Sequence, residues 1–431
     1  MADSKTLIAQ RNDSSFAHVL DELNWRGLVS LSTDAKELRQ LLSQPITFYC
    51  GFDPTAPSLH LGNLVQLLTM RRLQLAGHHP LALVGGATGL IGDPKPTAER
   101  TLNDRETVAS WVEKLADQNR KFLSFEGKNK AQMVNNLDWT SQYSAIDFLR
   151  DIGKHYRVGK MLAKDAVSAR LNSESGISYT EFSYQIMQGL DFLELYRRYG
   201  CVLETGGSDQ WGNLTSGADL VHRVEGKNVH LIATPLITNA DGKKFGKSEG
   251  NAVWLDADLT SAYAMYQFWL NTDDADVIDR LKVFTFLTRE EIENYAVQVA
   301  EEPYKRAAQR RLALEVTELV HSEKQALATE AASQALFGLG ELVDLDPETL
   351  RTALNELPHI NCEIGISVVS ALVESGLVES NGQARRAIAQ RSVSVNKVKV
   401  TDEMAVIDQH LPGKVAVLSR GKKSLAGLFF N

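Results

Sequence analysis

Apolar and polar positions around residue 50 predict a strand, a helix and a second strand in succession. Residues 46–52 are rich in β-branched and aromatic side chains and run into the turn sequence DPTAP, which is typical of a buried strand. Residues 58–76 place their apolar side chains on one face of a helix, and Gly77 follows as a stop signal. Residues 80–84 form the second predicted strand, which two glycines end. This βαβ order predicts a parallel sheet.

Weaker signals extend the sheet further along the chain. Residues 132–135 and 201–204 are additional strand candidates, and residues 186–199 are helical between them. We therefore expect an α/β, Rossmann-like catalytic domain with a parallel sheet at residues 1–240.

The second half of the chain changes from sheet to helix and then to a mixed pattern. Helical periodicity dominates residues 261–332, so we expect residues 241–340 to hold a lysine-rich loop and an all-helical domain. The pattern becomes patchy where two prolines interrupt it, which predicts a linker at residues 341–361. Two short helices and an alternating stretch at 392–400 predict a small α+β domain at residues 362–431.

Composition and charge limit the class of protein. The 431 residues are 43% hydrophobic and 23% charged, as in a soluble globular chain that buries a large core. Three widely spaced cysteines without a CxxC pair argue against a structural zinc site and indicate a reducing compartment. The N-terminus is polar and no stretch is long and apolar enough to span a bilayer, so we expect a cytoplasmic protein without membrane contact. The net charge of −8 leaves nucleic-acid binding to a local basic patch.

The first motif lies after the first predicted strand, where parallel α/β sheets bind ligands. It consists of residues 51–55, GFDPT, and residues 60–63, HLGN, at the start of a helix whose N–H groups and dipole favour phosphate. Thr55 and His60 are able to donate hydrogen bonds to a phosphoryl oxygen, and Gly62 leaves room for a flat base. The alternative is that His60 only caps the helix, and this motif alone favours neither interpretation.

The second motif is the lysine-rich segment at residues 242–248, GKKFGKS. Lys244 and Lys247 are suited to a loop that closes on phosphate, although a solvent-exposed basic turn is the commoner meaning of such a segment. A P-loop, GxxxxGK[ST], is rejected because Asp241 stands where the first glycine is required and the residues that follow do not predict a helix. No GxGxxG sequence supports a tightly bound dinucleotide cofactor.

A third pattern places three polar side chains on one helix face. Tyr184, Gln188 and Asp191 are spaced i, i+4, i+7, and burying them is costly unless they meet a polar ligand. The alternative is that this face meets water, because a separate apolar face exists on the same helix. The spacing alone allows both.

The motifs together resemble a known family. HLGN and KFGKS resemble the two signatures of class I aminoacyl-tRNA synthetases. Residues 49–56, 92–94, 179–191 and 206–213 resemble the bacterial type of tyrosyl-tRNA synthetase, and the likeness runs nearly the full chain. The resemblance implies that L-tyrosine is activated with ATP and Mg²⁺ to tyrosyl-adenylate, that tyrosine is transferred to tRNA(Tyr), and that the enzyme is a homodimer.

The resemblance also implies roles for single residues. The expected tyrosine site holds the phenolic hydroxyl with Tyr49 and Asp191, the ammonium group with Asp93, Tyr184 and Gln188, and the carboxylate near Gln210. The expected ATP site consists of Cys50, Gly51, Asp53, Gly62, Asn63, Asp209 and Lys247. The expected catalytic groups, which stabilise the departing pyrophosphate, are Thr55, His60, Lys244 and Lys247.

Two segments depart from the family pattern. The loop that begins at Gly92-Asp93-Pro94 is one residue shorter than in many relatives, so no phosphate contact is assigned to Lys95 or Arg100. Phe245 and Gly246 replace the methionine and first serine of the second signature.

The C-terminal domain resembles a small RNA-binding domain shared with a ribosomal small-subunit protein. Arg385, Arg386 and Arg391 lie on or beside one short predicted helix, and Lys397 follows in the predicted hairpin. Such a face suits an RNA backbone, whereas the alternative is a solvated basic helix. Attachment to a synthetase core favours RNA.

Other functions compete with this interpretation. A tryptophanyl-tRNA synthetase shares the core but would not need the hydroxyl-binding pair. A catalytically inactive paralogue that binds RNA would not need the HLGN and KFGKS segments. A P-loop NTPase is excluded by the spacing given above.

Overall fold

The computed structural model describes residues 4–94, 101–173, 176–238, 247–248, 251–421 and 424–431. The chain divides into two compact units, one formed by residues 1–256 with 273–308 and the other by residues 257–272 with 309–431. The division that we expect at residues 240, 340 and 361 is finer than these units and stays a prediction. No helix among the described residues is long and apolar enough to cross a membrane.

The first unit is built on a six-stranded sheet with the strand order β1-β6-β5-β2-β3-β4. Strands β2 to β6 run parallel, and β1 pairs antiparallel with β6 at one edge. The chain winds outward from β2 through β3 to β4, then returns to the other side of β2 with β5 and β6. The strands are β1 (Leu31–Ser32), β2 (Thr47–Phe52), β3 (His79–Val84), β4 (Gln132–Asn135), β5 (Cys201–Gly207) and β6 (His230–Thr234).

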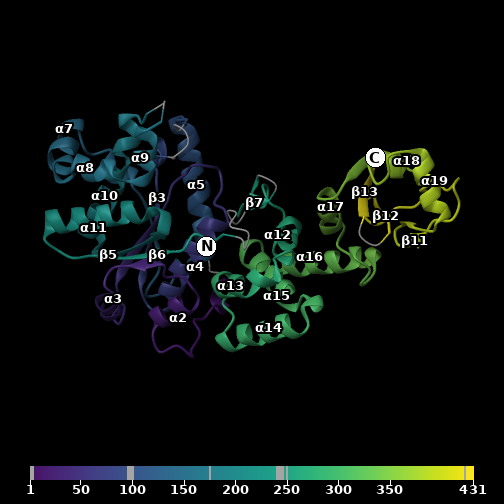
Figure 1. Cartoon of the computed structure of the whole chain (residues 1–431), viewed down its shortest axis with the longest axis horizontal. Coiled ribbons are helices and arrows are strands. Elements are labelled where there is room, and N and C mark those ends of the chain that lie inside the picture. The colour runs from purple at the N-terminus through teal and green to yellow at the C-terminus, as the bar shows by residue number, and fades with distance from the viewer. Residues whose placement is uncertain (1–3, 95–100, 174–175, 239–246, 249–250, 422–423) are drawn as a thin grey trace. The chain divides into compact units, whose positions relative to one another are not determined.

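Helices cover both faces of this sheet, which makes it a Rossmann-like fold and confirms the predicted class (Figure 1). Side chains alternate between the faces: Tyr49 packs with residues of α10 and α11, whereas the neighbouring Cys50 contacts Gln66 of α4. The principal helices of the unit are α4 (Leu61–Leu75), α5 (Arg105–Phe122), α10 (Tyr179–Tyr199), α11 (Trp211–Glu225), α13 (Asp274–Phe284) and α14 (Arg289–Glu301). Shorter helices are α1 (Lys5–Ala9), α2 (Val19–Trp25), α3 (Ala35–Leu41), α6 (Leu137–Thr140), α7 (Ala145–Asp147), α8 (Val158–Leu162) and α9 (Asp165–Leu171).

Helix α10 is longer in the structure than the sequence pattern predicts. It begins at Tyr179, seven positions before the expected start at residue 186, because the hydroxyl of Ser178 caps it by accepting a hydrogen bond from the N–H of Glu181. It ends at Gly200, whose φ of 62° is a left-handed conformation that glycine adopts without strain. Helix α11 packs closely against α10, since a Cβ at Gly189 of α10 would lie 3.6 Å from the Cα of Gly217 of α11.

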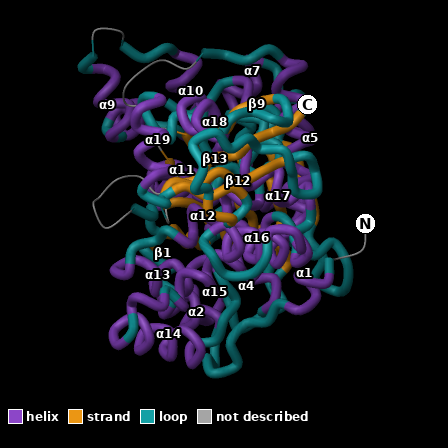
Figure 2. The backbone as a smooth tube through the Cα atoms, turned by 90° about the vertical axis from the view of Figure 1, so that its right-hand side faces the viewer, coloured by secondary structure: helices purple, strands orange, loops and turns teal. Residues whose placement is uncertain are grey.

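The second unit joins helices to a small mixed sheet. Its five strands have the order β11-β10-β12-β13-β9, with β9 parallel to β13 and the other pairs antiparallel. Figure 2 shows β12 and β13 side by side, as their pairing requires. The strands are β9 (His359–Cys362), β10 (Val393–Val395), β11 (Val398–Lys399), β12 (Val415–Arg420) and β13 (Ser424–Phe430). The helices are α12 (Ala262–Leu270), α15 (Ala307–Val320), α16 (Glu323–Leu336), α17 (Pro347–Asn355), α18 (Val368–Glu374) and α19 (Asn381–Ala389), with α15 beginning at the boundary of the units.

The stretch where we expect a linker, residues 341–361, contains regular structure. Asp346 caps α17 by accepting from the N–H of Thr349, and Pro347 occupies the first turn, where a proline is well tolerated. Strand β9 follows directly and pairs with β13. The Asp346-Pro347 sequence therefore starts a helix here.

Candidate active site

The candidate site lies where the strand order of the sheet reverses, between β2 and β5. In open parallel sheets the ends of two such neighbouring strands diverge and leave a crevice at their carboxyl ends. Tyr49, Cys50 and Gly51 lie on β2, and β5 leads directly to Asp209 and Gln210. The fold therefore brings together two groups of predicted residues that are far apart in the sequence.

Asp191 is a buried carboxyl group in the crevice whose pKa is strongly raised. Its side chain is 2% exposed, and its two oxygens accept hydrogen bonds from Trp139 Nε1 at 2.9 Å and Asn136 Nδ2 at 3.0 Å. Burial raises the pKa of Asp191 to about 8, although both hydrogen bonds favour the ionised form. A buried carboxyl group of this kind in a crevice is typical of a binding or catalytic site.

A chain of hydrogen bonds connects Asp191 to Tyr184 on the same helix face. Asn136 Nδ2 also donates to Thr88 Oγ1 at 2.8 Å, and Thr88 donates to Asp53 Oδ1 at 2.6 Å. The Tyr184 hydroxyl donates to the other Asp53 oxygen at 2.7 Å. Tyr184 and Asp191 are buried, so the alternative that this face meets water is wrong for both.

Tyr49 and Gln188 bring polar atoms without a partner into the same region. The Tyr49 hydroxyl is buried and makes no hydrogen bond of normal geometry to a described residue, and its ring packs edge-on against Phe192 at 5.2 Å between centroids. The Gln188 side-chain oxygen is also buried without a partner among the described residues. Unsatisfied buried polar atoms are costly, so this arrangement indicates a pocket prepared for a polar ligand.

A second polar cluster lies at the end of β5. Gln210 Nε2 approaches Asp93 Oδ2 at 3.4 Å, and Asn213 Nδ2 lies 3.3 Å from the other oxygen of Asp93. Asn213 also donates to Gln210 Oε1 at 2.8 Å and accepts from Lys164 Nζ. Burial lowers the pKa of Lys164, while the charge of Asp93 opposes that shift.

Some of the residues expected to contact ATP or its pyrophosphate are exposed beside this buried pocket, whereas Cys50 is buried and Asp53 and Asn63 are half-buried. Gly51, Thr55, His60, Gly62 and Asp209 are exposed. His60 caps α4, because its Nδ1 accepts from Gly62 N at 3.0 Å. The capping interpretation is therefore correct for His60, and a contact with phosphate stays a prediction.

The cap also explains the start of α4. The helix begins at Leu61, three residues later than predicted, because His60 pairs as an isolated bridge with Trp254. Asn63 Oδ1 accepts from His60 N at 3.1 Å and completes a capping box. A Cβ at Gly62 would lie 2.8 Å from the His60 ring, so a larger residue there would displace the ring from its capping position.

The lysine-rich segment lies mostly outside the described residues. Lys244, Lys95 and Arg100 are among the residues that the structure does not describe, so the role predicted for Lys244 stays a prediction. Lys247 lies in β7 (Lys247–Ser248), which pairs antiparallel with β8 (Asn251–Ala252). A P-loop requires a helix after its GKS sequence, and this strand pair confirms that the segment is not one.

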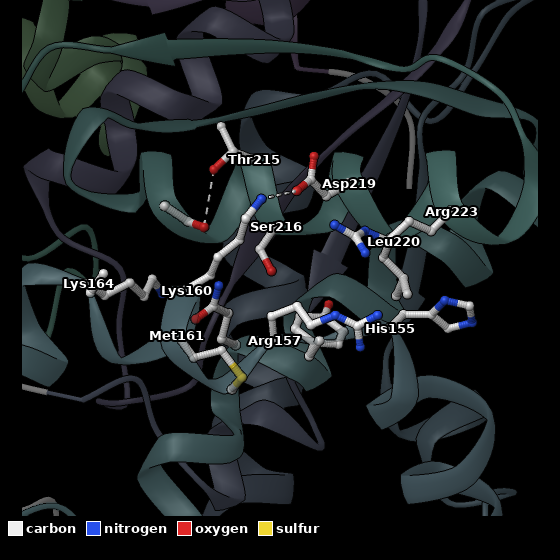
Figure 3. A pocket seen from close by; sticks show the side chains of 14 residues that line it. His155, Arg157, Lys160, Met161, Lys164, Thr215, Ser216, Asp219, Leu220 and Arg223 are labelled. Atoms are coloured by element: carbon white, nitrogen blue, oxygen red, sulfur yellow. Dashed lines mark hydrogen bonds and ion pairs between the residues drawn. The ribbon is translucent and has the colours of Figure 1, made fainter.

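A basic pocket of about 350 Å³ adjoins the second polar cluster through Lys164. Figure 3 shows His155, Arg157 and Arg223 on one side of this pocket and Lys164 on the other. Lys160 forms an ion pair with Asp219 at 3.8 Å. Burial and the charges of Lys154, Arg223 and Arg157 lower the pKa of His155, which indicates a positive potential.

Comparison with known proteins gives the family. A family model described as "tRNA synthetases class I (W and Y)" matches residues 42–338, and one described as "Tyrosine--tRNA ligase SYY-like C-terminal domain" matches residues 349–426. A relative from Leifsonia xyli subsp. xyli, named a tyrosine–tRNA ligase, is 67% identical over 426 residues, which cover 98% of this chain and 96% of the relative. One of the same name from Streptomyces avermitilis is 62% identical over 414 residues, covering 95% and 98%.

This chain belongs to the tyrosine–tRNA ligase family of class I tRNA synthetases. Among solved structures, a C-terminally truncated mitochondrial tyrosyl-tRNA synthetase of Coccidioides posadasii matches with a TM-score of 0.65 and 32% identity, over 73% of this chain and 92% of that one. A tryptophanyl-tRNA synthetase of Encephalitozoon cuniculi shares the fold, with a TM-score of 0.55 and 13% identity over 74% and 93% of the two chains.

The tyrosine–tRNA ligase C-terminal module carries the predicted RNA-binding residues. Arg385 and Arg386 lie on α19, and Arg391 and Lys397 follow it at positions with φ of 54° and 68°. All four are exposed. Arg385 lies 3.9 Å from Glu403, and Lys397 Nζ contacts the Gly340 carbonyl. Their contact with RNA stays a prediction.

Sequence reasoning missed several residues of the site. Asn136, Trp139 and Thr88 hold the network around Asp191, but they lie in short segments that follow strands and have no periodic signal. Lys164 was also missed, whereas Asn213 lies inside the GSDQWGN segment that carries the resemblance. Their shared signal is a polar residue placed just beyond the end of a strand or at the start of a helix.

The raised pKa of Asp191 predicts how the free energy of unfolding depends on pH. A carboxyl group whose pKa is higher in the folded protein binds its proton more tightly there, so the protonated form favours folding. The stability of the wild type should therefore fall as the pH rises from about 3.8, the ordinary pKa of an aspartate, to about 8, the pKa in the folded protein. Asp191→Asn removes this dependence because an amide does not ionise. We expect the stability of the variant relative to the wild type to rise by ~2–4 kcal/mol between about pH 5 and pH 8 in urea titrations. A difference that is constant over this range would contradict the raised pKa.

Proposed function

We propose that this protein is a tyrosine–tRNA ligase that activates L-tyrosine with ATP to tyrosyl-adenylate and pyrophosphate, then transfers the tyrosine to the 3′ end of tRNA(Tyr). The observation that carries the proposal is the buried polar pocket around Asp191 at the reversal of the strand order. The near full-length identity of 67% to a relative named for this activity supports it.

Activation is an in-line displacement at the α-phosphorus of ATP. The tyrosine carboxylate is already ionised at pH 7, so it attacks without a general base. A new bond forms between that carboxylate and the α-phosphorus, and the bond to the departing pyrophosphate breaks. Catalysis therefore depends on positioning and on stabilising the charge of the leaving group. Thr55, His60, Lys244 and Lys247 are the groups that we assign to that charge.

Recognition of tyrosine depends on the phenolic hydroxyl. In our assignment Tyr49 and Asp191 bind it, and both are almost completely buried. Phenylalanine would leave these polar atoms without a partner, which is costly in a site shielded from water. Tyrosyl-tRNA synthetases are themselves the established example of this effect, with a discrimination of about 10⁵-fold against phenylalanine.

The ammonium group and the carboxylate of tyrosine are assigned to the remaining polar side chains of the pocket. We assign the ammonium group to Asp93, Tyr184 and Gln188, whose unpartnered oxygen is able to accept a hydrogen bond from it. The Tyr184 hydroxyl donates a hydrogen bond to Asp53, which fixes its orientation and leaves its oxygen to face the ammonium group. Gln210, which lies beside Asp93, is assigned to the carboxylate.

ATP brings its own Mg²⁺ as part of the substrate. Among the described residues, no cluster of three or more His, Cys, Asp or Glu side chains is placed to hold a metal. We therefore assign no protein ligand to the ion and derive no step from it. The residues assigned to the nucleotide are Cys50, Gly51, Asp53, Gly62, Asn63, Asp209 and Lys247.

Two basic surfaces suit the tRNA. The pocket lined by His155, Arg157, Lys164 and Arg223 adjoins the Asp93 cluster, where the adenylate has to meet the terminal ribose of the tRNA. The exposed side chains on and after α19 suit another part of the RNA backbone. We assign the pocket to phosphates near the 3′ end.

A homodimer in the cytoplasm completes the proposal. Four apolar side chains between residues 146 and 162 are exposed, which is typical of a surface covered by a partner. Their exposed fractions are 72% for Ile146, 52% for Leu149, 59% for Val158 and 37% for Leu162.

The activity is tested by exchange of labelled pyrophosphate into ATP without tRNA, in the presence of tyrosine, tryptophan or phenylalanine. We expect exchange with tyrosine alone, because activation is reversible and the hydroxyl pocket rejects the other two. Exchange with tryptophan in place of tyrosine would contradict the assigned pocket. A folded protein that shows no exchange with any amino acid would favour an inactive paralogue that binds RNA.

Asp191→Ala tests the assignment of the phenolic hydroxyl. Loss of a buried hydrogen-bond partner typically costs ~1–3 kcal/mol, so we expect the KM for tyrosine to rise by about 5- to 150-fold. Selectivity over phenylalanine should fall by a similar factor, while the KM for ATP stays within about twofold. Equal losses for tyrosine and ATP, measured by pyrophosphate exchange on a folded variant, would remove Asp191 from this role.

The basic pocket is tested by the double variant Arg157→Ala, Arg223→Ala. We expect it to retain pyrophosphate exchange and to raise the KM for tRNA in aminoacylation by about tenfold, since each lost phosphate contact weakens RNA binding. The matched control is Lys121→Ala, Lys128→Ala, which removes two exposed charges that do not line the pocket. A KM for tRNA that is the same in both double variants would contradict the assignment.

A further inference from the structure

A second buried carboxyl group, Glu204, lies beneath the proposed tyrosine pocket. It stands in the middle of β5, where its Cα pairs with Tyr49 of β2 on one side and Leu231 of β6 on the other. The side chain is 3% exposed and lies on the face covered by α10 and α11. Helix α11 encloses it closely, since a Cβ at Gly217 would be 3.7 Å from Glu204 Oε2.

Glu204 contacts the two pocket residues that carry polar atoms without a partner. Gln188 Nε2 lies 3.5 Å from Glu204 Oε1, a long hydrogen bond. Its carboxyl group also lies close enough to the Tyr49 hydroxyl that its charge adds to the burial that raises the pKa of Tyr49. Glu204 is therefore the one described carboxyl group that interacts with both Tyr49 and Gln188.

No positive charge faces Glu204 among the titratable groups that interact with it in the described structure. These groups are Tyr49 and Cys50 on β2, Cys201 on β5 itself, Asp191 on α10 and Tyr156 before α8. Burial, together with the charge of Asp191, raises the pKa of Glu204 to about 8. An ionised carboxylate here would be a buried charge without a cation, which is strongly unfavourable.

We propose that Glu204, as an uncharged carboxyl group, is the positioning residue that sets the direction of the hydrogen bonds which Tyr49 and Gln188 offer to tyrosine. The inference rests on the proposed function and extends it to a residue outside the assigned tyrosine site. It also assigns a role to the one buried carboxyl group that the proposed mechanism leaves unused in this pocket.

The direction follows from what each group is able to donate. In the proposed arrangement the carbonyl oxygen of an uncharged carboxyl group accepts the hydrogen bond from the Gln188 amide. The O–H of the same carboxyl group is then directed at the phenol oxygen of Tyr49, which has no partner of normal geometry among the described residues. The Tyr49 O–H is then left to donate a hydrogen bond to the phenol oxygen of the substrate, whose own O–H donates to a carboxyl oxygen of Asp191. An ionised Glu204 would accept the Tyr49 proton instead and remove that donor from the substrate.

Three substitutions separate this role from a merely structural one. Glu204→Gln keeps the shape, one acceptor and one donor, but does not ionise. Glu204→Met keeps much of the volume and removes both polar functions. Glu194→Gln is the matched control: Glu194 is a buried carboxylate on α10 whose partners are Tyr143, Arg197 and Arg198.

The measurement is the KM for tyrosine in pyrophosphate exchange between about pH 6.5 and pH 9.5, with the KM for ATP measured alongside. For the wild type we expect the KM for tyrosine to increase more steeply above about pH 8 than in Glu204→Gln, because Glu204 ionises only in the wild type. Asp191 and the ammonium group of the substrate titrate in both proteins and set the common part of the profile. Glu204→Gln should keep the wild-type KM within about twofold at pH 7 and show only that common part. Glu204→Met should raise the KM for tyrosine about tenfold and lower selectivity over phenylalanine, with the KM for ATP unchanged. Glu194→Gln should keep the wild-type values and pH profile.

Two results would overturn the inference. One is an alkaline increase in Glu204→Gln equal to that of the wild type, and the other is a folded Glu204→Met variant with a wild-type KM for tyrosine. If Glu204→Met does not fold, the pH profile of Glu204→Gln gives the answer alone. Absence of tyrosine-dependent exchange in the wild type would instead overturn the proposed function, and this inference with it.

Discussion

A buried carboxyl group needs hydrogen-bond donors around it, and Asp191 creates this requirement inside the first unit. Trp139 and Asn136 supply the two donors, and both reach Asp191 only because the end of β4 lies beside α10. Hydrogen bonds continue from Asn136 to Thr88, from Thr88 to Asp53, and from Tyr184 to Asp53, so these side chains are held in place as well. One helix face and the ends of three strands, β2, β3 and β4, are thus fixed relative to each other before any ligand binds, which is the condition for a selective pocket.

The backbone accommodates this network through glycine. A Cβ at Gly85 would lie 2.1 Å from Asp53 Oδ1, and one at Gly86 would lie 2.3 Å from Asn135 Oδ1. The two glycines that end β3 therefore allow polar side chains to approach the chain closely at the carboxyl edge of the sheet. The same edge has a buried side, with Tyr49 and Asp191, and an exposed side, with Thr55 and Asp209. This contrast suits an aromatic amino acid on one side and a charged nucleotide on the other.

Much of the first unit follows from local patterns, and the rest depends on contacts that a single sequence does not show. The βαβ unit and the shared face of Tyr184 and Asp191 come from periodicity, which is a local property. The roles of Trp139 and Asn136 depend on the packing of distant segments, so no local signal gives them. The stretch that includes α17 has the sequence pattern of a linker because a proline is found both after the end of a helix and in the first turn of one. The hydrogen bond by which Asp346 caps α17 shows that Pro347 starts a helix here.

A crystal structure with bound L-tyrosine tests the central claim most directly, namely that the buried network reads the phenolic hydroxyl. We predict the phenol oxygen within hydrogen-bonding distance of the Tyr49 hydroxyl and the Asp191 carboxyl group, with the ammonium group beside Gln188. A bound tyrosine whose ring points toward the exposed rim at Thr55, with Asp191 contacted only by Trp139 and Asn136, would contradict it.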